Sequence, residues 1–576
     1  MNVYTNASTL RALCAILTVA LLNPVGQASA SELASEPVQT FSGNVLAEQA
    51  AVAADHPLAS QVGVDIMQAG GNAVDAAVAV GLVLGVVNPF ASGLGGGGFL
   101  LVRTPDGVVE ALDFRETAPA AAHRDMYVGG DGEVDRSASI TGGLAVAVPG
   151  ELAGFWAAHE RYGVLPWATV IEPARALAAD GFEAGTLLEG RLDGNSRLSP
   201  DSPLARVFQN EDGYVRAGDV VRRPGLARAL QSLATDGPNV FYTGWIADDI
   251  AAAAQGAGGV MTTEDLAGYA PRWSAPVSTT YAGHTVHGMP LPSSGGYVIA
   301  QVLDMLSDFA VVRLAYDDAA FAHLVMSALA PAFAVRAHEM GDGLSREDAD
   351  ARFRGRRQLE RARSSYSPVT IGEATDYGAI IEAPRDAGTS HFSVIDPNGM
   401  AVACTSTVNT SFGSLVLATE SGIVLNNEMD DFASQPGVPN VFGLVGSEAN
   451  SIAPGRRPLS SMSPTIVEDQ EGLVGVLGGS GGPRIITGTL LALLQLIHYE
   501  RTALEAVSAP RFHHQWLPFK AFVESTASVS WRERLGDFDY DVTIQSFGSA
   551  VQVIWRHGDG WQAASDPRKH GVAAGF

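Results

Sequence analysis

Hydroxyl-bearing side chains are concentrated in one short stretch of the sequence, GTSHFSVIDPNGMAVACTSTVNT, which covers residues 388–410. Its serine and threonine residues are Thr389, Ser390, Ser393, Thr405, Ser406, Thr407 and Thr410. A serine or threonine hydroxyl becomes a nucleophile when a nearby base removes its proton. This stretch is therefore the first candidate for catalytic chemistry.

The same stretch has the pattern of a β-hairpin. β-Branched residues dominate Thr389–Ile395 and Met400–Val408, and Asp-Pro-Asn-Gly between them is a turn sequence. A three-residue loop with Gly399 in the left-handed conformation fixes the register of the two strands. In that register Thr407 lies directly opposite Thr389, so we expect their hydroxyls to be within cross-strand reach.

A hydroxyl at this place could cleave the chain. Gly388 adds little bulk beside its own carbonyl group, so attack there is unhindered and leaves Thr389 with a free α-amine. An α-amine has a pKa of about 8 and can act as the base for the hydroxyl of its own residue. The pattern is that of an N-terminal nucleophile hydrolase. A threonine-rich hairpin at a sheet edge, without catalytic function, is the structural alternative.

Three other motifs point to structure rather than to cofactors. GLGGGG (93–98) has the Gly-x-Gly-x-x-Gly spacing, but a helical pattern precedes it and the strand FLLV follows it, the reverse of a dinucleotide site. Close backbone packing is the better explanation. GGSGGPR (478–484) lacks the Lys-Ser/Thr of a P-loop and is either a turn or a site where backbone N–H groups converge on an anion. His513 and His514 are adjacent, so on a strand they point to opposite faces and do not form a metal site.

Charge and composition limit the possible partners. The chain has 576 residues, 46% of them hydrophobic, and a formal net charge of −26, with only two lysines, Lys520 and Lys569. An acidic surface poor in lysine argues against binding to nucleic acid or anionic lipid.

The N-terminus has the three parts of a secretory signal peptide. Arg11 precedes the apolar run ALCAILTVALL, and Ala28-Ser29-Ala30 is an A-x-A cleavage site. We expect residues 1–30 to be removed and the mature chain to be periplasmic or secreted; an uncleaved membrane anchor is the alternative. Cys14 would leave with the peptide, so Cys404 would be the only cysteine and no intrachain disulfide would be possible.

Periodicity predicts several elements in the rest of the chain. The apolar stretch NAVDAAVAVGLVLGVVNPF indicates a buried helix, and FLLVRTPDGVVEALDFR indicates a hairpin. Further helices are predicted at 149–161, 168–180, 296–309 and 315–340. Strands are predicted to dominate from residue 390 onward, and 351–388 is predicted to be an exposed connector.

From about residue 45 to its C-terminus the chain resembles a γ-glutamyltranspeptidase (γ-glutamyl transferase) of the bacterial type. The resemblance lies in stretches that follow the order of the family: NPFASGLGGGGFLLV, DFRETAP, VPGELAGFWAAHERYGVLPW, PLPSSGG, TSHFSV, STVNTSFGS, GIVLNNEMDDF, RRPLSSMSPTIV, GGSGGPRIIT and APRFHHQWLP. It implies an α+β fold, the four-layer αββα sandwich of N-terminal nucleophile hydrolases. It also implies a precursor that cleaves itself between Gly388 and Thr389 into a large subunit (31–388) and a small subunit (389–576), which stay interlaced. No metal or organic cofactor is implied.

The resemblance also implies functions for individual residues. Thr389 is the nucleophile, and Thr407 supports it. The residues matched to binding of the substrate α-carboxylate are Arg115, Ser460 and Ser461. Those matched to binding of its α-ammonium are Asn409, Glu428 and Asp431. The oxyanion hole is matched by Gly481 and Gly482.

The segment QPGVPNVFGL corresponds to the lid loop of bacterial relatives. Its presence favours γ-glutamyl substrates over the bulkier glutaryl-cephalosporins, which relatives without the lid use. Phe442 occupies the place of a gating tyrosine whose hydroxyl bonds the asparagine matched by Asn409. Because phenylalanine lacks that hydroxyl, we expect the lid to close by packing alone. Phe90, in NPFASG, is bulkier and less polar than the family leads us to expect.

Taken with the resemblance, the sequence predicts an extracytoplasmic γ-glutamyl hydrolase/transferase that acts on glutathione and related compounds. The Thr389 acyl-enzyme would pass its acyl group to water or to an amino acid or peptide amine. Two alternatives stay open. One is an amidase like the glutaryl-cephalosporin acylases, and the other is an uncleaved, inactive homologue that binds amino acids.

Overall fold

Two β-sheets packed face to face form the centre of the computed structural model, which describes residues 40–377, 388–435 and 437–576. The predicted signal peptide, residues 1–30, lies outside the described residues. The last part of the predicted connector, residues 378–387, lies outside them as well.

The first sheet has eight antiparallel strands and carries the hydroxyl-rich hairpin at its centre. In spatial order its strands are β1 (Thr40–Ser42), β24 (Val572–Gly575), β3 (Ala51–Ala54), β13 (Gly388–Ile395), β14 (Ala401–Asn409), β4 (Gly97–Arg103), β5 (Val109–Phe114) and β10 (Arg272–Ser274). The predicted hairpin in 99–115 is the β4–β5 pair.

The second sheet has seven strands, which are also antiparallel. In spatial order they are β11 (Val277–Tyr281), β12 (His284–Gly288), β17 (Thr465–Asp469), β18 (Gly472–Ser480), β22 (Ala550–His557), β23 (Gly560–Ser565) and β2 (Asn44–Ala47). The central strand β18 packs against β13 and β14 of the first sheet.

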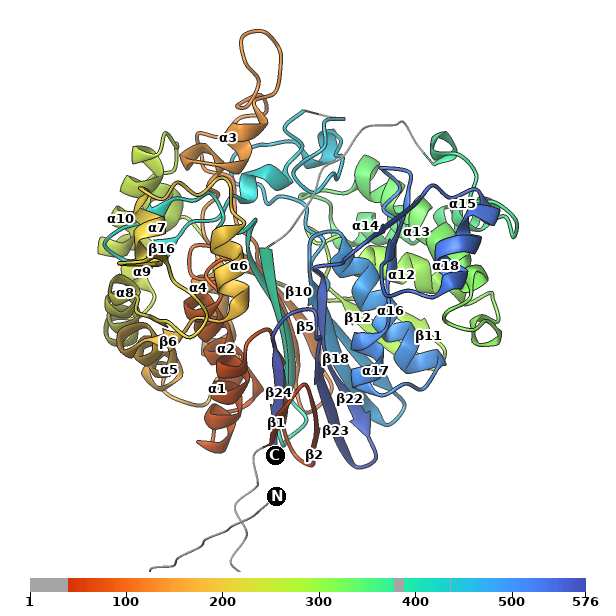
Figure 1. The fold of residues 1–576 in the computed structure, drawn as a ribbon, viewed down its shortest axis with the longest axis horizontal. Helices are drawn as coiled ribbons and strands as arrows, with labels where there is room; N and C mark the ends of the chain where they lie inside the picture. Colours follow the sequence, from red (N-terminus) through yellow and green to blue (C-terminus); the bar gives the residue numbers. More distant parts are fainter. Residues whose placement is uncertain (1–39, 378–387, 436) are drawn as a thin grey trace, which may run out of the picture. The chain divides into compact units, whose positions relative to one another are not determined.

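Helices cover the outer face of each sheet (Figure 1). On the first sheet lie α1 (Pro57–Gln68), α2 (Ala73–Val87) and α4 (Glu151–Tyr162), while α5 (Trp167–Asp180) packs on α2 and α8 (Pro224–Asp236) packs on α5. On the second lie α12 (Gly295–Leu306), α16 (Arg484–His498) and α17 (Ala503–Ser508), and α13 (Ala319–Glu339) packs on α12. The predicted αββα sandwich is confirmed, and so are the helices expected near 149–161, 168–180, 296–309 and 315–340.

Side-chain alternation along the strands explains the layers. On β14, Val402 and Cys404 pack toward the helices, whereas Ala401 and Ala403 face the other sheet. Successive residues of a strand point to opposite faces, so a run that is apolar at every position must be covered on both sides. Small residues on the inner face allow the two sheets to approach closely.

Two helices are apolar on all sides because they are buried on all sides. All residues of α2 except Gly85 are buried, and the Asn72–Asp75 capping box fixes its N-terminus. Among the described residues, α13 is the one helix long and apolar enough to cross a membrane, yet 94% of its apolar window is buried within the protein. It is packed in the core that covers the second sheet.

The prediction of an exposed connector over 351–388 is wrong in its first part. Residues 346–353 and 356–364 form the helices α14 (Arg346–Phe353) and α15 (Arg356–Ser364). In α15 the arginines face outward, whereas Gln358 and Ala362 are buried and Leu359 packs against the core. An amphipathic helix such as α15 is stabilised by the packing of its apolar face, although most of its residues are charged.

The hairpin follows the predicted register from its turn as far as a β-bulge at Thr389. Gly399 has a φ of +78°, and the pairs run from Ile395–Ala401 to Ser390–Ser406 as expected. A β-bulge then intervenes, so that Gly388, not Thr389, is paired, and its partner is Asn409. The prediction that Thr389 lies directly opposite Thr407 is therefore wrong, because Thr389 lies in the bulge and pairs with no residue of β14. The alternative of an edge hairpin is wrong, because β13 and β14 lie between β3 and β4 and are buried.

Candidate active site

One pocket gathers ten of the eleven residues proposed from the sequence. The predicted residues that line it are Arg115, Thr389, Thr407, Asn409, Glu428, Asp431, Phe442, Ser460, Ser461 and Gly482. Gly481, the eleventh, is the chain neighbour of Gly482. Leu444, Met462 and Ile485 complete the wall. We call this cavity the Thr389 pocket.

Two threonine hydroxyls converge on one carbonyl group in this pocket. Thr389 Oγ1 donates to the carbonyl oxygen of Gly388 at 2.7 Å, and Thr407 Oγ1 donates to the same oxygen at 2.6 Å. The backbone N–H of Asn409 in turn donates to Thr407 Oγ1 at 2.8 Å, which orients that hydroxyl. Hydrogen bonds to a carbonyl oxygen stabilise the negative charge that develops there during attack. The bulge brings about this geometry, since it places Thr389 out of the regular ladder.

Gly388 itself is closely surrounded by backbone. A Cβ atom at this position would lie 2.8 Å from the carbonyl oxygen of Phe90 and 3.0 Å from that of Thr410. Glycine is therefore the residue that fits beside Thr389.

Lys569 holds the other side of Thr389, and sequence reasoning missed it. Its Nζ atom donates to the carbonyl oxygen of Thr389 at 2.5 Å and forms an ion pair with Asp55 at 2.9 Å. Asp55 also accepts a hydrogen bond from Gln552. Lys569 is buried, so its charge and that of Asp55 compensate each other beside Thr389. The sequence signal that could have pointed to Lys569 is the rarity of lysine, since the chain has only two lysines.

A buried cluster of charges forms the opposite wall of the pocket. Arg115, directly after β5, donates to Glu428 and, at 2.5 Å, to Asp431, while its Nε donates to the carbonyl oxygen of Pro458 at 3.2 Å. Glu116 forms an ion pair with the same guanidinium, with 3.8 Å between its Oε2 atom and a terminal nitrogen of Arg115. Three carboxylates thus surround one arginine.

The protonation of this cluster follows from burial and crowding. Burial raises the pKa of Glu428 well above its ordinary value, and the neighbouring carboxylates Glu116 and Asp431 add to that increase although Arg115 opposes it. Burial also raises the pKa of Glu116 to about 7. Glu428 and Glu116 are both fully buried beside Arg115 and both have a raised pKa, so at least one of these two glutamates is protonated near neutral pH.

Ser460 and Ser461 lie beside a second buried arginine that the sequence did not reveal. Arg336, in the last turn of α13, donates to Ser461 Oγ at 3.3 Å and to Ser294 Oγ at 3.0 Å. Burial lowers the pKa of Arg336 to about 10. In the described part of the chain no carboxylate forms an ion pair with Arg336, although the charge of Asp431 acts on it electrostatically.

The glycine pair at the end of β18 has the geometry of an anion site. Gly481 and Gly482 have φ values of +122° and +60°, and α16 begins immediately after Pro483. Successive N–H groups in such conformations, at the N-terminus of a helix, form a concave site for negative charge. Neither N–H group has an acceptor among the described residues. For the GGSGGPR stretch, this geometry favours an anion site over a simple turn.

The lid loop is held by polar contacts in addition to packing. Phe442 is buried against the pocket, as predicted. Asn440, however, donates to Asp431 at 2.9 Å and accepts hydrogen bonds from the N–H groups of Phe442 and Leu444. The expectation that the lid closes by packing alone is therefore wrong, because Asn440 couples the loop directly to the charge cluster.

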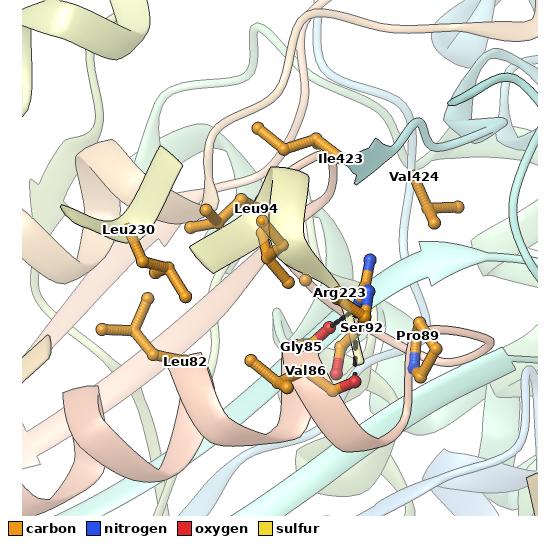
Figure 2. Close-up of a pocket in the computed structure, with 12 residues that line it drawn as sticks. Leu82, Gly85, Val86, Pro89, Ser92, Leu94, Arg223, Leu230, Ile423 and Val424 are labelled. Carbon is orange, nitrogen blue, oxygen red and sulfur yellow. Dashed lines mark hydrogen bonds between the residues drawn. The ribbon is translucent and has the colours of Figure 1, made fainter. Parts of the chain in front are cut away.

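A second, narrow pocket lies between α2 and α8 and differs in character (Figure 2). Leucine, isoleucine and valine side chains dominate its lining. Its arginine, Arg223, donates to the carbonyl oxygens of Gly85 and Val86 in the last turn of α2, as Figure 2 shows. A cation at this end of a helix stabilises the helix dipole, so Arg223 has a structural function.

The other motifs have structural explanations as well. In the 93–98 stretch, a Cβ atom on Gly95 or Gly96 would lie 2.0 Å from a backbone oxygen, as close packing requires. His513 bonds Thr487 and Gln515, while His514 accepts a hydrogen bond from the N–H of Trp516. No group of three His, Cys, Asp or Glu side chains suited to a metal ion occurs within the described ranges.

Comparison with known proteins agrees with this geometry. The sequence model of the family described as gamma-glutamyltranspeptidase matches residues 59–576. The chain is 42% identical over 531 residues to the glutathione hydrolase proenzyme of Escherichia coli strain K12, covering 91% of each protein. It is 38% identical over 547 residues to glutathione hydrolase proenzyme 1 of Schizosaccharomyces pombe, covering 91% of this chain and 84% of that protein.

Solved structures show the same fold. The γ-glutamyltranspeptidase of Helicobacter pylori is 33% identical, with a TM-score of 0.52, and the match covers 55% of this chain and 91% of that one. Cephalosporin acylase from Bacillus halodurans has a TM-score of 0.78 at 24% identity, over 96% of this chain and 99% of that one. At that identity the second likeness concerns the fold alone.

Proposed function

The chain belongs to the γ-glutamyltranspeptidase family, and on that premise we propose that its chemistry takes place in the Thr389 pocket, with Thr389 as the nucleophile. The protein is a γ-glutamyl hydrolase/transferase that is made as a self-processing precursor. The observation that supports Thr389 most directly is the convergence of its hydroxyl and that of Thr407 on the carbonyl oxygen of Gly388.

Maturation follows from this contact. Thr389 Oγ1 attacks the carbonyl carbon of Gly388, Thr407 stabilises the developing oxyanion, and the bond between Gly388 and the nitrogen of Thr389 breaks. The nitrogen takes the proton, and Gly388 becomes an ester on Thr389 Oγ1. Water then hydrolyses the ester, which yields a Gly388 carboxylate and a Thr389 with a free hydroxyl and a free α-amine.

The topology supports two subunits that stay together after cleavage, with boundaries at 31–388 and 389–576. In the first sheet, strands from the two segments alternate: β1 and β3 flank β24, and β13–β14 lies between β3 and β4. Both sheets therefore contain strands from both segments. Separating the segments would break both ladders and expose the core, so cleavage at one peptide bond leaves the fold intact.

Recognition of the γ-glutamyl group uses the charge cluster. A glutamyl moiety linked through its side chain keeps a free α-carboxylate and a free α-ammonium. The carboxylate pairs with Arg115, and Ser460 and Ser461 donate to it. The ammonium then replaces Arg115 as the partner of Glu428 and Asp431, with Asn409 as a further acceptor. A zwitterion can thus enter this buried cluster without leaving any charge unpaired.

Catalysis repeats the maturation chemistry on the substrate. The α-amine of Thr389 takes the proton of its own hydroxyl, and Oγ1 attacks the γ-carbonyl carbon. The N–H groups of Gly481 and Gly482 stabilise the oxyanion. The leaving amine takes the proton and departs, and the acyl group on Thr389 passes to water or to the amine of an amino acid or peptide. Glutathione, named for the curated relatives, is the proposed donor.

A pair of anilide substrates tests the proposed function. γ-Glutamyl-p-nitroanilide carries both charges of the glutamyl group, whereas glutaryl-p-nitroanilide lacks only the ammonium. The charge cluster predicts that kcat/KM for the glutamyl substrate exceeds that for the glutaryl substrate by about a hundredfold or more. Equal turnover of the two would favour an amidase of the glutaryl-cephalosporin-acylase kind.

We further propose that the enzyme works outside the cytoplasm, in the periplasm or the medium. The support is the signal-peptide pattern of residues 1–30. N-terminal sequencing of the large subunit from the native source should read from Ser31. A large subunit that still begins at Met1 would contradict this localisation.

A further inference from the structure

The motif PLPSSGG (290–296) has no function in the chemistry described so far, yet it lies directly beside the substrate-binding serines. Its neighbour is the segment PLSSM (458–462), which forms part of the wall of the Thr389 pocket. The N–H of Ser294 donates to the carbonyl oxygen of Ser460 at 2.8 Å, and the Ser294 hydroxyl donates to the same oxygen at 2.6 Å. The first segment therefore fixes the backbone of the second.

Arg336, in the last turn of α13, is buried and joins the two segments through its side chain. Its Nε atom donates to Ser294 Oγ at 3.0 Å, and a terminal nitrogen donates to Ser461 Oγ at 3.3 Å. Both acceptors lie outside α13, so the dipole of that helix alone does not explain the position of this guanidinium. One arginine thus holds a serine side chain from each segment.

The bond from Arg336 limits the direction in which the Ser461 hydroxyl can point. A guanidinium has N–H donors and no acceptor, so Ser461 Oγ accepts from it and directs its own hydrogen elsewhere. Ser460 is in the same state, because its Oγ accepts from the N–H of Met462 at 3.2 Å. Among the described residues neither hydroxyl donates to an acceptor, and both serines line the Thr389 pocket. Both hydrogens are therefore available to a ligand in that pocket.

The charge of Arg336 strengthens this arrangement. Burial lowers its pKa to about 10, so the guanidinium remains charged at neutral pH; Asp431 favours that charge and Arg115 opposes it. The side chain therefore lies within electrostatic range of the charge cluster. A hydroxyl that accepts a hydrogen bond from a cation becomes a stronger donor, because linked hydrogen bonds polarise one another. The Ser461 hydroxyl is thereby prepared to donate to an anion.

We propose that Arg336 is a positioning residue for the α-carboxylate of the γ-glutamyl substrate, acting through the hydroxyl of Ser461 and, by way of Ser294, through the backbone of Ser460. This inference rests on the proposed function, in which Arg115 and the two serines bind that carboxylate. Arg336 is not among the residues that line the pocket, so it acts without touching the substrate. Without it the serines lose their fixed orientation, and recognition of the α-carboxylate weakens while the chemical step is kept.

Two anilide donors that differ only in the α-carboxylate test the assignment. γ-Glutamyl-p-nitroanilide has this group, and γ-aminobutyryl-p-nitroanilide is the same molecule without it. In the wild type, kcat/KM for the glutamyl donor should exceed that for the aminobutyryl donor by about a hundredfold or more. In Arg336→Met this ratio should fall about tenfold through a higher KM for the glutamyl donor, whereas kcat/KM for the aminobutyryl donor should change less than about twofold. An unchanged ratio, or an equal loss for both donors, would overturn the assignment.

Arg223→Met is the matched control. Arg223 and Arg336 are each 3% exposed, burial lowers the pKa of each to about 10, and the acceptors of Arg223 are the main-chain carbonyl oxygens of Gly85, Val86 and Gly422. Loss of this buried arginine should leave the ratio between the two donors unchanged. A similar fall of the ratio in Arg223→Met would show a general effect of removing a buried charge and would overturn the assignment.

Two further variants follow the route of the effect. Ser294→Ala keeps the guanidinium but removes its link to Ser460, so the ratio should fall in the same direction, which provides the test if Arg336→Met does not fold. A wild-type ratio in Ser294→Ala would count against the assignment. Arg336→Met combined with Ser461→Ala should lower the ratio by less than the product of the two single effects. A full product would overturn the route through Ser461.

Failure of the proposed function would give a different result from failure of this inference. A wild-type enzyme that cleaves neither anilide, or that cleaves both equally well, would contradict recognition of the γ-glutamyl group in the Thr389 pocket. A wild-type preference for the glutamyl donor that Arg336→Met fully retains would contradict the function of Arg336 alone.

Discussion

Thr389 Oγ1 and Thr407 Oγ1 lie 3.3 Å apart, and each donates to the carbonyl oxygen of Gly388. The contact joins the two strands of the hairpin at the bulge, where regular pairing ends. One hydroxyl is therefore placed to attack the carbonyl group while the other stabilises the charge that the attack creates.

Removing the second hydroxyl should slow maturation. Thr407→Val keeps the shape of the side chain but loses one hydrogen bond to the developing oxyanion, so self-cleavage should slow by about ten- to hundredfold. Thr407→Ser should stay near the wild-type rate. The measurement is the fraction of cleaved chain against time on a denaturing gel. Thr405→Val, two residues away on the same strand, is the control, and equal slowing in that variant would contradict the function given to Thr407.

Loss of Arg115 should impair substrate binding but not maturation. Arg115→Ala removes the partner of the substrate α-carboxylate, and kcat/KM for γ-glutamyl-p-nitroanilide should fall by about ten- to hundredfold or more. Self-cleavage should be preserved, because Arg115 makes no contact with Gly388 in the structure. Asp431→Asn, which weakens the site of the α-ammonium, should act in the same direction. Mature variants with wild-type kinetics would show that the residues are wrongly assigned.

The lid should control the balance between transfer and hydrolysis. Asn440→Ala removes the hydrogen bond to Asp431 and those to the backbone of the loop, so the lid should open more often and admit water. At a fixed acceptor concentration, the ratio of transfer to hydrolysis should fall severalfold. Phe442→Tyr, which adds a hydroxyl within the pocket, should raise the ratio. If neither variant changes it, the loop does not gate the site.

Stability should fall as the pH rises because of Glu151. This buried residue on α4 accepts a hydrogen bond from Ser406, and burial raises its pKa from the ordinary 4.5 to about 8. Between these values the folded protein holds a proton that the unfolded chain has lost, so the free energy of unfolding decreases by about 1.4 kcal/mol per pH unit.

Glu151→Gln should remove that part of the slope. The variant should lose less Tm than the wild type between pH 6 and pH 8, as measured by thermal unfolding. Glu160→Gln, an exposed glutamate at the other end of the same helix, is the control and should leave the slope unchanged. A steeper fall in Glu151→Gln than in the wild type would contradict the protonated state of Glu151.

Local patterns and the family resemblance predict most of the site from the sequence. The hairpin, its Gly399 turn and the pairing up to Ser390–Ser406 follow from residue type and loop length alone. The bulge at Thr389 does not, because it depends on Gly388 fitting between Phe90 and Thr410, which are distant in sequence. The resemblance supplied the pocket residues, and the structure places ten of them around one cavity.

Arg336 and Lys569 could not be found in this way. Arg336 lies in the last turn of a buried helix, where a basic residue is explained by the helix dipole. Lys569 lies close to the C-terminus and reaches Thr389 only because β24 and β13 are both neighbours of β3. Their function depends on tertiary contacts, and neither type nor spacing indicates it.

The most direct test of the central claim is the N-terminus of the small fragment. Purified wild-type protein should give two bands on a denaturing gel, and the smaller one should begin at Thr389 and have the mass of residues 389–576. Thr389→Ala should give a single band and no turnover of γ-glutamyl-p-nitroanilide. A wild-type enzyme that is active as one uncleaved chain, or a Thr389→Ala variant that yields the same two bands, would contradict Thr389 as the nucleophile.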